Sequence, residues 1–186
     1  MKSRNAIAFI VMVALIVVSL LLGAYKGWSA ERDEVASAET TLQDALKTRV
    51  ETANNILTVA RRHLSGDDAG IAALVKEKDN LLRTGQTLAA QSKASAAVGK
   101  SASMLLDALA ALDDVKADNR DNMYVTALLP QMLQSSEMLV TDAENAYLSL
   151  ANDFNARFKA NFISGFLSRL MGVSWAETYD AAAVSN

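Results

Sequence analysis

The chain has 186 residues and a formal net charge of −3, and 51% of its residues are hydrophobic although only 6% are aromatic. Eight glycines and one proline provide few turn-forming residues for this length, so long helices are expected. The lack of cysteine excludes disulfides, thiolate metal sites and a lipid-modified cysteine, and the acidic balance argues against nucleic acid as a partner.

A long uncharged apolar run lies near the N-terminus. Residues 6–22 read AIAFIVMVALIVVSLLL. Extended to Tyr25, the run has about twenty residues, enough for a helix to cross the roughly 30 Å hydrocarbon core of a bilayer. We therefore predict a transmembrane signal-anchor at 6–25. A cleaved signal peptide is the alternative, but the run exceeds the roughly 7–15 apolar residues usual for one, and Trp28-Ser29-Ala30 is a poor cleavage site.

The basic residues that flank the run predict its orientation. Lys2 and Arg4 precede it, whereas Lys26 follows it and Arg32 stands among acidic residues. Lys and Arg near a span resist translocation, so the segment with more of them stays inside. Residues 1–5 are therefore expected in the cytoplasm, and the rest of the chain beyond the span is expected on the other side.

Residues 26–160 are predicted to form one helical domain. From Val35 to Leu64 the apolar residues recur at every third or fourth position, which indicates one face of a helix over about 30–64. His63 is the only histidine and lies beside two arginines in the last turn, where cations suit the helix dipole. A structural role for it is therefore expected before metal binding.

Three further helical patterns follow in the same domain. Small residues at 92–99 and the Asn/Asp cluster at 118–122 are expected to form turns between them. Pro130 should kink the last helix or mark its true start, because proline lacks the N–H that a helix interior uses. No segment alternates with the two-residue period of a strand. The predicted fold class is all-α, with the transmembrane helix followed by an antiparallel up-down bundle of about four long helices.

Arg49 lies between apolar positions of the first helix of this domain and should be covered by a neighbouring helix. A covered arginine needs an acidic partner. If the first and fourth helices run antiparallel, their register brings Glu137 and Asp142 close to Arg49. We predict a structural ion pair with one of the two, Glu137 first, and prefer this role to ligand binding.

Residues 161–186 are predicted to form a short amphipathic helix and a tail. Its apolar residues recur every three or four positions, and an even number of antiparallel helices returns the chain to the membrane end. The helix is therefore expected at the membrane surface, where basic residues on either side favour anionic headgroups. Packing of the stripe against the open end of the bundle is the alternative. The candidate membrane-interface residues are Tyr25, Trp28, Phe162, Phe166, Leu170 and Trp175.

Two stretches resemble the LemA family of bacterial membrane proteins. The first is Leu46-Lys-Thr-Arg49-Val-Glu51-Thr-Ala-Asn-Asn55-Ile56-Leu57, which is similar to the family's Leu-x-x-Arg-x-Asp-Leu-x-Pro-Asn-Leu-Val segment. The second runs from Leu133 and Glu137 through Tyr147, Phe154-Asn155 and Gly172 to Tyr179-Asp180, at spacings similar to the family's Leu-x-x-x-Glu, Tyr-Asn, Tyr-Asn, Gly-Phe and Phe-Glu sequence. In these stretches Glu51 stands for Asp, Asn54 for Pro, Leu148 for Asn and Val173 for Phe. The resemblance implies an all-helical protein of the bacterial cell envelope, and it carries over no catalytic residue.

The sequence offers no pattern for catalysis, a cofactor or a metal. It lacks a Gly-x-Ser-x-Gly nucleophile elbow and a phosphate-binding glycine loop, so a hydrolase is not expected. Asp114, Asp118 and Asp121 recur at helical spacing, but Arg120 stands where a calcium loop needs an oxygen donor and no glycine is near. We interpret these aspartates as a solvated acidic face.

These observations predict a non-enzymatic scaffold or adaptor of the LemA type. It would be a single-pass protein of the bacterial cytoplasmic membrane, with its domain on the extracytoplasmic side and with membrane lipid and other envelope proteins as partners. The alternative is an extracytoplasmic ligand-sensing helical domain. A sensor usually signals through a second span and a cytoplasmic output domain, and the sequence predicts neither.

Overall fold

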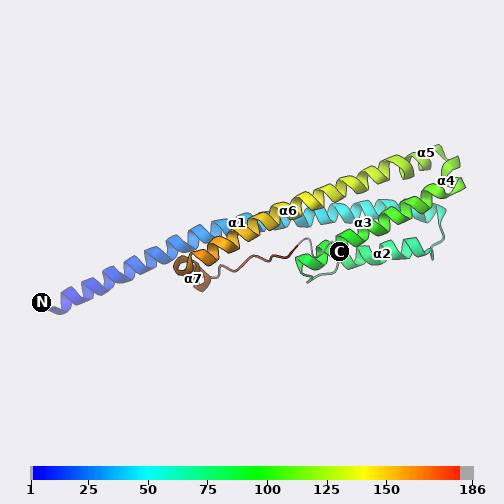
Figure 1. Cartoon of the computed structure of the whole chain (residues 1–186). Helices are drawn as coiled ribbons and strands as arrows, with labels where there is room; N and C mark the ends of the chain where they lie inside the picture. The colour runs from blue at the N-terminus through cyan, green and yellow to red at the C-terminus, as the bar shows by residue number, and fades with distance from the viewer. Residues whose placement is uncertain (1, 181–186) are drawn as a thin grey trace. The chain divides into compact units, whose positions relative to one another are not determined.

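The computed structural model describes residues 2–180, and the side chains from residue 8 onward. Within this range every regular element is a helix and no strand occurs, so the predicted fold class is confirmed at this level. Contacts divide the chain into two compact units. Unit 1 combines the chain up to Ala38 with Leu148–Glu177, and unit 2 combines Glu39–Tyr147 with the chain from Thr178. Figure 1 labels the helices in chain order.

Helix α1 spans Lys2–His63 and contributes to both units. Its apolar section is exposed, with Phe9, Leu15 and Leu20 each 62% exposed. In the described part of the chain, this is the one helix long and apolar enough to cross a membrane. The sequence pattern separates the span at 6–25 from a helix that begins near residue 30, whereas the structure joins them. The junction contains no proline, and isolated glycines in a helix are tolerated.

In unit 2, helix α2 (Ala69–Leu81) packs against helix α3 (Leu88–Ala111). Asp68 caps α2 by accepting hydrogen bonds from the backbone N–H groups of Gly70 and Ile71. The turn expected at 92–99 is wrong, because these residues lie inside α3. Their alanines are strong helix formers, and the chain turns instead before α3, where Gly85 adopts a φ of +75°.

Two short helices, α4 (Asp113–Ala117) and α5 (Asn119–Met123), follow α3. The Asn/Asp cluster at 118–122 therefore forms little loop, which corrects the sequence prediction. Only Asp118 leaves the helical conformation between the two helices, and its side chain accepts hydrogen bonds from the backbone N–H groups of Arg120 and Asp121. Asp118 consequently ends α4 and begins α5, as acidic capping residues do at a helix start.

A π-helical turn, η1 (Tyr124–Leu128), leads into helix α6 (Leu129–Ala160). The N–H of Leu129 bonds the carbonyl of Tyr124, five residues back. Pro130 follows directly after this turn, inside a run that stays helical from Asn119 to Ala160, and a π turn is a usual way for a helix to accommodate the N–H that proline lacks. Pro130 thus lies within a continuous helical run, next to the π turn that interrupts its regular hydrogen-bond pattern.

Unit 1 contains the remaining helix, α7 (Phe162–Leu170), which follows α6 after Asn161. Residues from Gly172 to Asp180 form no helix. Gly172 has a φ of +99° and lets the chain leave α7. The amide of Asn155 holds the segment that follows, because its Nδ2 donates to the carbonyl of Ala176 at 2.9 Å and its Oδ1 accepts from the N–H of Ala176 at 3.0 Å.

Candidate functional site

Arg49 is enclosed in unit 2, with a side chain that is only 2% exposed. Its Nη1 donates to the carbonyl of Leu133 and to the hydroxyl of Ser136, both at 3.2 Å. Its Nη2 lies 3.8 Å from Oε2 of Glu137. Burial lowers the pKa of Arg49, and the nearby Glu137 carboxylate raises it in part. Neutral oxygens of α6 therefore make the closest contacts with this charge.

Helix α3 covers Arg49 from another side. A Cβ built on Gly99 would collide with Nη2 of Arg49. Because only glycine leaves room for this approach, Gly99 is a packing residue inside a helix. The sequence pattern places it in a turn and gives no sign that two residues fifty positions apart meet in this way.

The two predicted partners of Arg49 lie in different surroundings. Glu137 is the one that the structure places near the guanidinium, although its side chain is 66% exposed. Asp142 is exposed and makes no ion pair within the described residues. Because water screens an exposed carboxylate, the energetic value of the Arg49–Glu137 pair stays a prediction.

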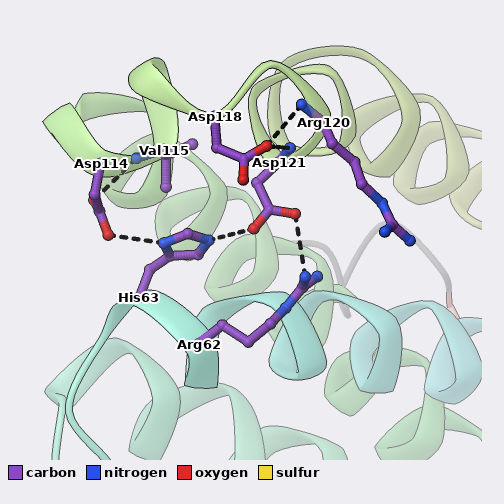
Figure 2. Close-up of polar contacts among 7 residues, drawn as sticks. All are labelled: Arg62, His63, Asp114, Val115, Asp118, Arg120 and Asp121. Carbon is purple, nitrogen blue, oxygen red and sulfur yellow. Dashed lines mark hydrogen bonds and ion pairs between the residues drawn. The ribbon is translucent and has the colours of Figure 1, made fainter.

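A second polar cluster lies at the C-terminal end of α1 (Figure 2). Nδ1 of His63 is 2.8 Å from Oδ2 of Asp114, and Nε2 of His63 is 2.7 Å from Oδ2 of Asp121. Arg62 Nη1 lies 3.2 Å from Oδ1 of Asp121, whose side chain is only 8% exposed. Asp121 thus faces two cationic side chains of the last turn of α1.

This cluster corrects the interpretation of the aspartates as a solvated acidic face. Asp114 and Asp121 converge on His63 from α4 and α5, whereas Asp118 caps α5. The helical spacing of the three residues is present in the sequence. The sequence does not reveal that Asp114 and Asp121 share His63 as a target, because this depends on the break at Asp118 and on how α4 and α5 return across the end of α1.

The protonation state of His63 follows from its two neighbours. A neutral imidazole has only one N–H, so only the imidazolium donates hydrogen bonds to a carboxylate at each nitrogen. The hydrogen bond with Asp114 is the main cause that raises the pKa of His63, and Asp121 adds to it against the effect of burial. The same bond lowers the pKa of Asp114. With both nitrogens occupied by carboxylates, His63 fits an ionic clamp better than a general base.

The candidate membrane-interface residues all lie in unit 1, where an aromatic cluster forms its core. The ring centroid of Trp28 is 6.0 Å from that of Phe154 and 5.1 Å from that of Phe158, and Trp175 lies 5.0 Å from Phe158. Nε1 of Trp28 donates to the hydroxyl of Ser164 at 3.2 Å. Edge-to-face packing of this kind is favourable for aromatic rings.

Trp28 is the one candidate among them that is packed within the protein. It is only 8% exposed because its ring is packed within the aromatic cluster and its indole N–H is used by Ser164. The other candidates face outward. Their exposed fractions are 36% for Tyr25, 77% for Phe162, 52% for Phe166, 69% for Leu170 and 41% for Trp175.

The contact between Arg49 and Glu137 can be measured with a double-mutant cycle. We expect Arg49→Met and Glu137→Gln to be non-additive in the free energy of unfolding by about 0.5–1 kcal/mol, because one partner is exposed. Urea unfolding of the wild-type chain, both single variants and the double variant measures this coupling. Asp142→Gln with Arg49→Met is the matched control and should be additive. Additive effects in the Glu137 cycle would show that Arg49 and Glu137 are not energetically coupled.

The His63 cluster predicts how stability depends on pH. The folded-state pKa of His63 is raised, so its contribution is complete below the unfolded value of 6.5 and is lost as pH rises through the folded value. The folded-state pKa of Asp114 is lowered, so its contribution is present above 3.8 and is lost as pH falls through the folded value.

Thermal unfolding from pH 4 to pH 9 should therefore show a fall in midpoint on the alkaline side of pH 6.5. His63→Gln should flatten this part of the profile, because glutamine does not titrate. Asn54→Gln, at an exposed site on the same helix, should keep the wild-type shape. An unchanged slope in the His63 variant would show that the cluster does not couple to folding.

Comparisons of the chain with protein-family models, with curated proteins and with solved structures find no match. The resemblance to the LemA family therefore rests on the two sequence stretches and stays a prediction. One residue from each stretch contributes to a contact in unit 2, where Nη2 of the enclosed Arg49 lies 3.8 Å from Oε2 of the exposed Glu137.

Proposed function

We propose that the protein is a single-pass membrane-anchored helical scaffold or adaptor of the LemA type, in the cytoplasmic membrane of a bacterium. Its N-terminus would lie in the cytoplasm, and unit 2 would lie on the extracytoplasmic side. The observation that carries this proposal is the continuity of α1, which passes from an exposed apolar section into unit 2 without a linker. An exposed apolar section of this length is costly in water and stable in lipid.

We propose an antiparallel up-down arrangement of four long helical segments for the bundle. Contacts within unit 2 support it. As α1 advances from Arg49 to His63, its contacts move back along the chain from Ser136 to Asp121. Helices α2 and α3 form a hairpin between these two segments. Short connections favour this antiparallel order.

A groove in unit 2 supports the adaptor role. It has a volume of about 360 Å³ and lies between α1 and α6. Leu139 is 51% exposed and Leu128 is 39% exposed at its wall, and Thr48 and Thr52 of α1 also line it. An apolar groove with a polar rim is a shape that takes the apolar face of a partner helix. The proposed partner is therefore a helix of another envelope protein.

The orientation can be tested with a cysteine, since the natural chain has none. Asn119 is exposed at the start of α5 in unit 2, so Asn119→Cys should react with a membrane-impermeant maleimide in intact cells. A cysteine at Lys2 is the matched control and should react only after lysis. Reaction of Asn119→Cys only after lysis would reverse the orientation.

The adaptor role can be tested by site-specific photocrosslinking in living cells. A photoreactive residue at Leu139 or Gln131 in the groove should give one and the same discrete protein adduct, because both positions face the proposed partner helix. The same residue at Asp107, which is exposed on α3, is the matched control and should give no such adduct. Leu128→Glu should remove the adduct by placing a charge in the groove. Equal adducts from all three positions, or none, would contradict the adaptor role.

A further inference from the structure

Helix α7 is amphipathic, but the face that it packs against the protein is the one with small residues and not the one with large apolar residues. Its two buried residues are Gly165 and Ser168. Its large apolar residues point outward, with Phe162 77% exposed, Phe166 52% exposed and Leu170 69% exposed. A helix on the surface of a soluble domain normally turns such a stripe toward the core. The stripe therefore does not cap unit 1, and it needs another apolar environment.

The small inner face of α7 is fixed by close contacts. A Cβ on Gly165 would lie 2.6 Å from the carbonyl oxygen of Phe158, so this approach of α7 to α6 depends on glycine. Ser164 accepts the indole hydrogen bond of Trp28, and the carbonyl of Ser168 accepts from the N–H of Val173 at 3.0 Å. Rotation of α7 that buried its apolar stripe would break these contacts.

The contacts with α1 place α7 next to the end of the apolar section. Trp28 is three residues beyond Tyr25, about one helical turn. Because Ser164 bonds Trp28 directly, α7 lies within unit 1 at the level where the apolar section gives way to charged residues. For a helix that spans a bilayer, this level is the headgroup region.

The charges around α7 complement an anionic surface. Residues 157–171 contain three basic residues and no acidic residue. Arg157 pairs with Glu31 at 3.2 Å. Lys159 and Arg169 remain at the edge of a groove of about 130 Å³, whose other lining residues are Phe158, Phe162, Gly165, Phe166 and Trp175.

We propose that α7 lies in the interface of the bilayer that α1 enters, as a second attachment of unit 1 to the membrane. Phe162, Phe166 and Leu170 insert beside the acyl chains, while Lys159 and Arg169 contact the phosphates of anionic phospholipids. This geometry matches interfacial helices with an apolar face and basic flanks. The proposal rests on the anchor of the proposed function and is independent of the adaptor role.

The test uses the full chain in vesicles of phosphatidylcholine with and without phosphatidylglycerol. Single spin labels are placed at Phe166→Cys and Leu170→Cys, and depth is measured from the relative accessibility to oxygen and to a water-soluble nickel complex. Ile16→Cys in the apolar section and Asn152→Cys on the exposed face of α6 are the controls. Labels at 166 and 170 should lie below the phosphate level, between these two controls. Labels as accessible to nickel as the label at Asn152 would overturn the proposal.

The headgroup contacts have a separate arm. In the wild-type chain the labels at 166 and 170 should lie deeper in vesicles with phosphatidylglycerol than in vesicles without it. Lys159→Gln with Arg169→Gln should remove this difference in depth, whereas Arg83→Gln with Lys100→Gln on unit 2 should keep it. An unchanged lipid dependence in the first variant would overturn the role of the two cations. Spin–spin broadening between labels at Phe166→Cys would instead identify a second copy of the chain on the stripe and overturn the lipid assignment. A label at Ile16→Cys that stayed in water would contradict the anchor itself, so failure of the proposed function is distinguishable.

Discussion

One constraint follows from the proposed membrane anchor: helix α1 must be compatible with two solvents. Between Phe9 and Leu22 its side chains are apolar except for Ser19 and exposed except for the half-buried Leu21, whereas from Val35 onward buried residues recur on one face. An all-round apolar surface suits lipid, and a single apolar stripe suits a protein core with water on the other side. Because both patterns occur on one unbroken helix, the change in pattern at Trp28 defines where lipid can end.

The long helices were predictable because each buries a stripe with helical period, and this period is visible in sequence. The turns were less predictable. Residues 92–99 are small and polar in part, but alanine favours helix and the sequence around Gly85 offers the left-handed conformation that a turn can use. Asp118 ends α4 and also caps α5, so the Asn/Asp cluster provides one non-helical residue and not a whole loop. Local composition therefore indicated that the chain turns between helices, but it did not indicate at which residues.

Enclosed polar residues were predictable only when burial demanded a partner. Arg49 stands between apolar positions, so its enclosure and its need for hydrogen-bond acceptors follow from the sequence. The identity of the nearest acceptors does not, since a carbonyl and a hydroxyl of α6 lie closer than the carboxylate of Glu137. His63 stands at a helix end where solvent alone would satisfy it. Its clamp between two aspartates depends on the tertiary path of α4 and α5, for which the sequence holds no periodic signal.

Helix α7 shows what amphipathic spacing leaves undetermined. The stripe of Phe162, Phe166 and Leu170 has the same period whether it faces a core or a membrane. The orientation of the stripe depends on the opposite face of α7. Gly165 and Ser168 on that face are small enough to approach α6 and the chain that follows, so the stripe faces away from the protein. Burial of a large apolar side chain is worth about 1.5–3 kcal/mol, so leaving several in water is unfavourable for an isolated domain. Beside an apolar section that is proposed to lie in lipid, the same exposed stripe would make a stabilising contact, and packing through the small face leaves the large apolar residues free for it.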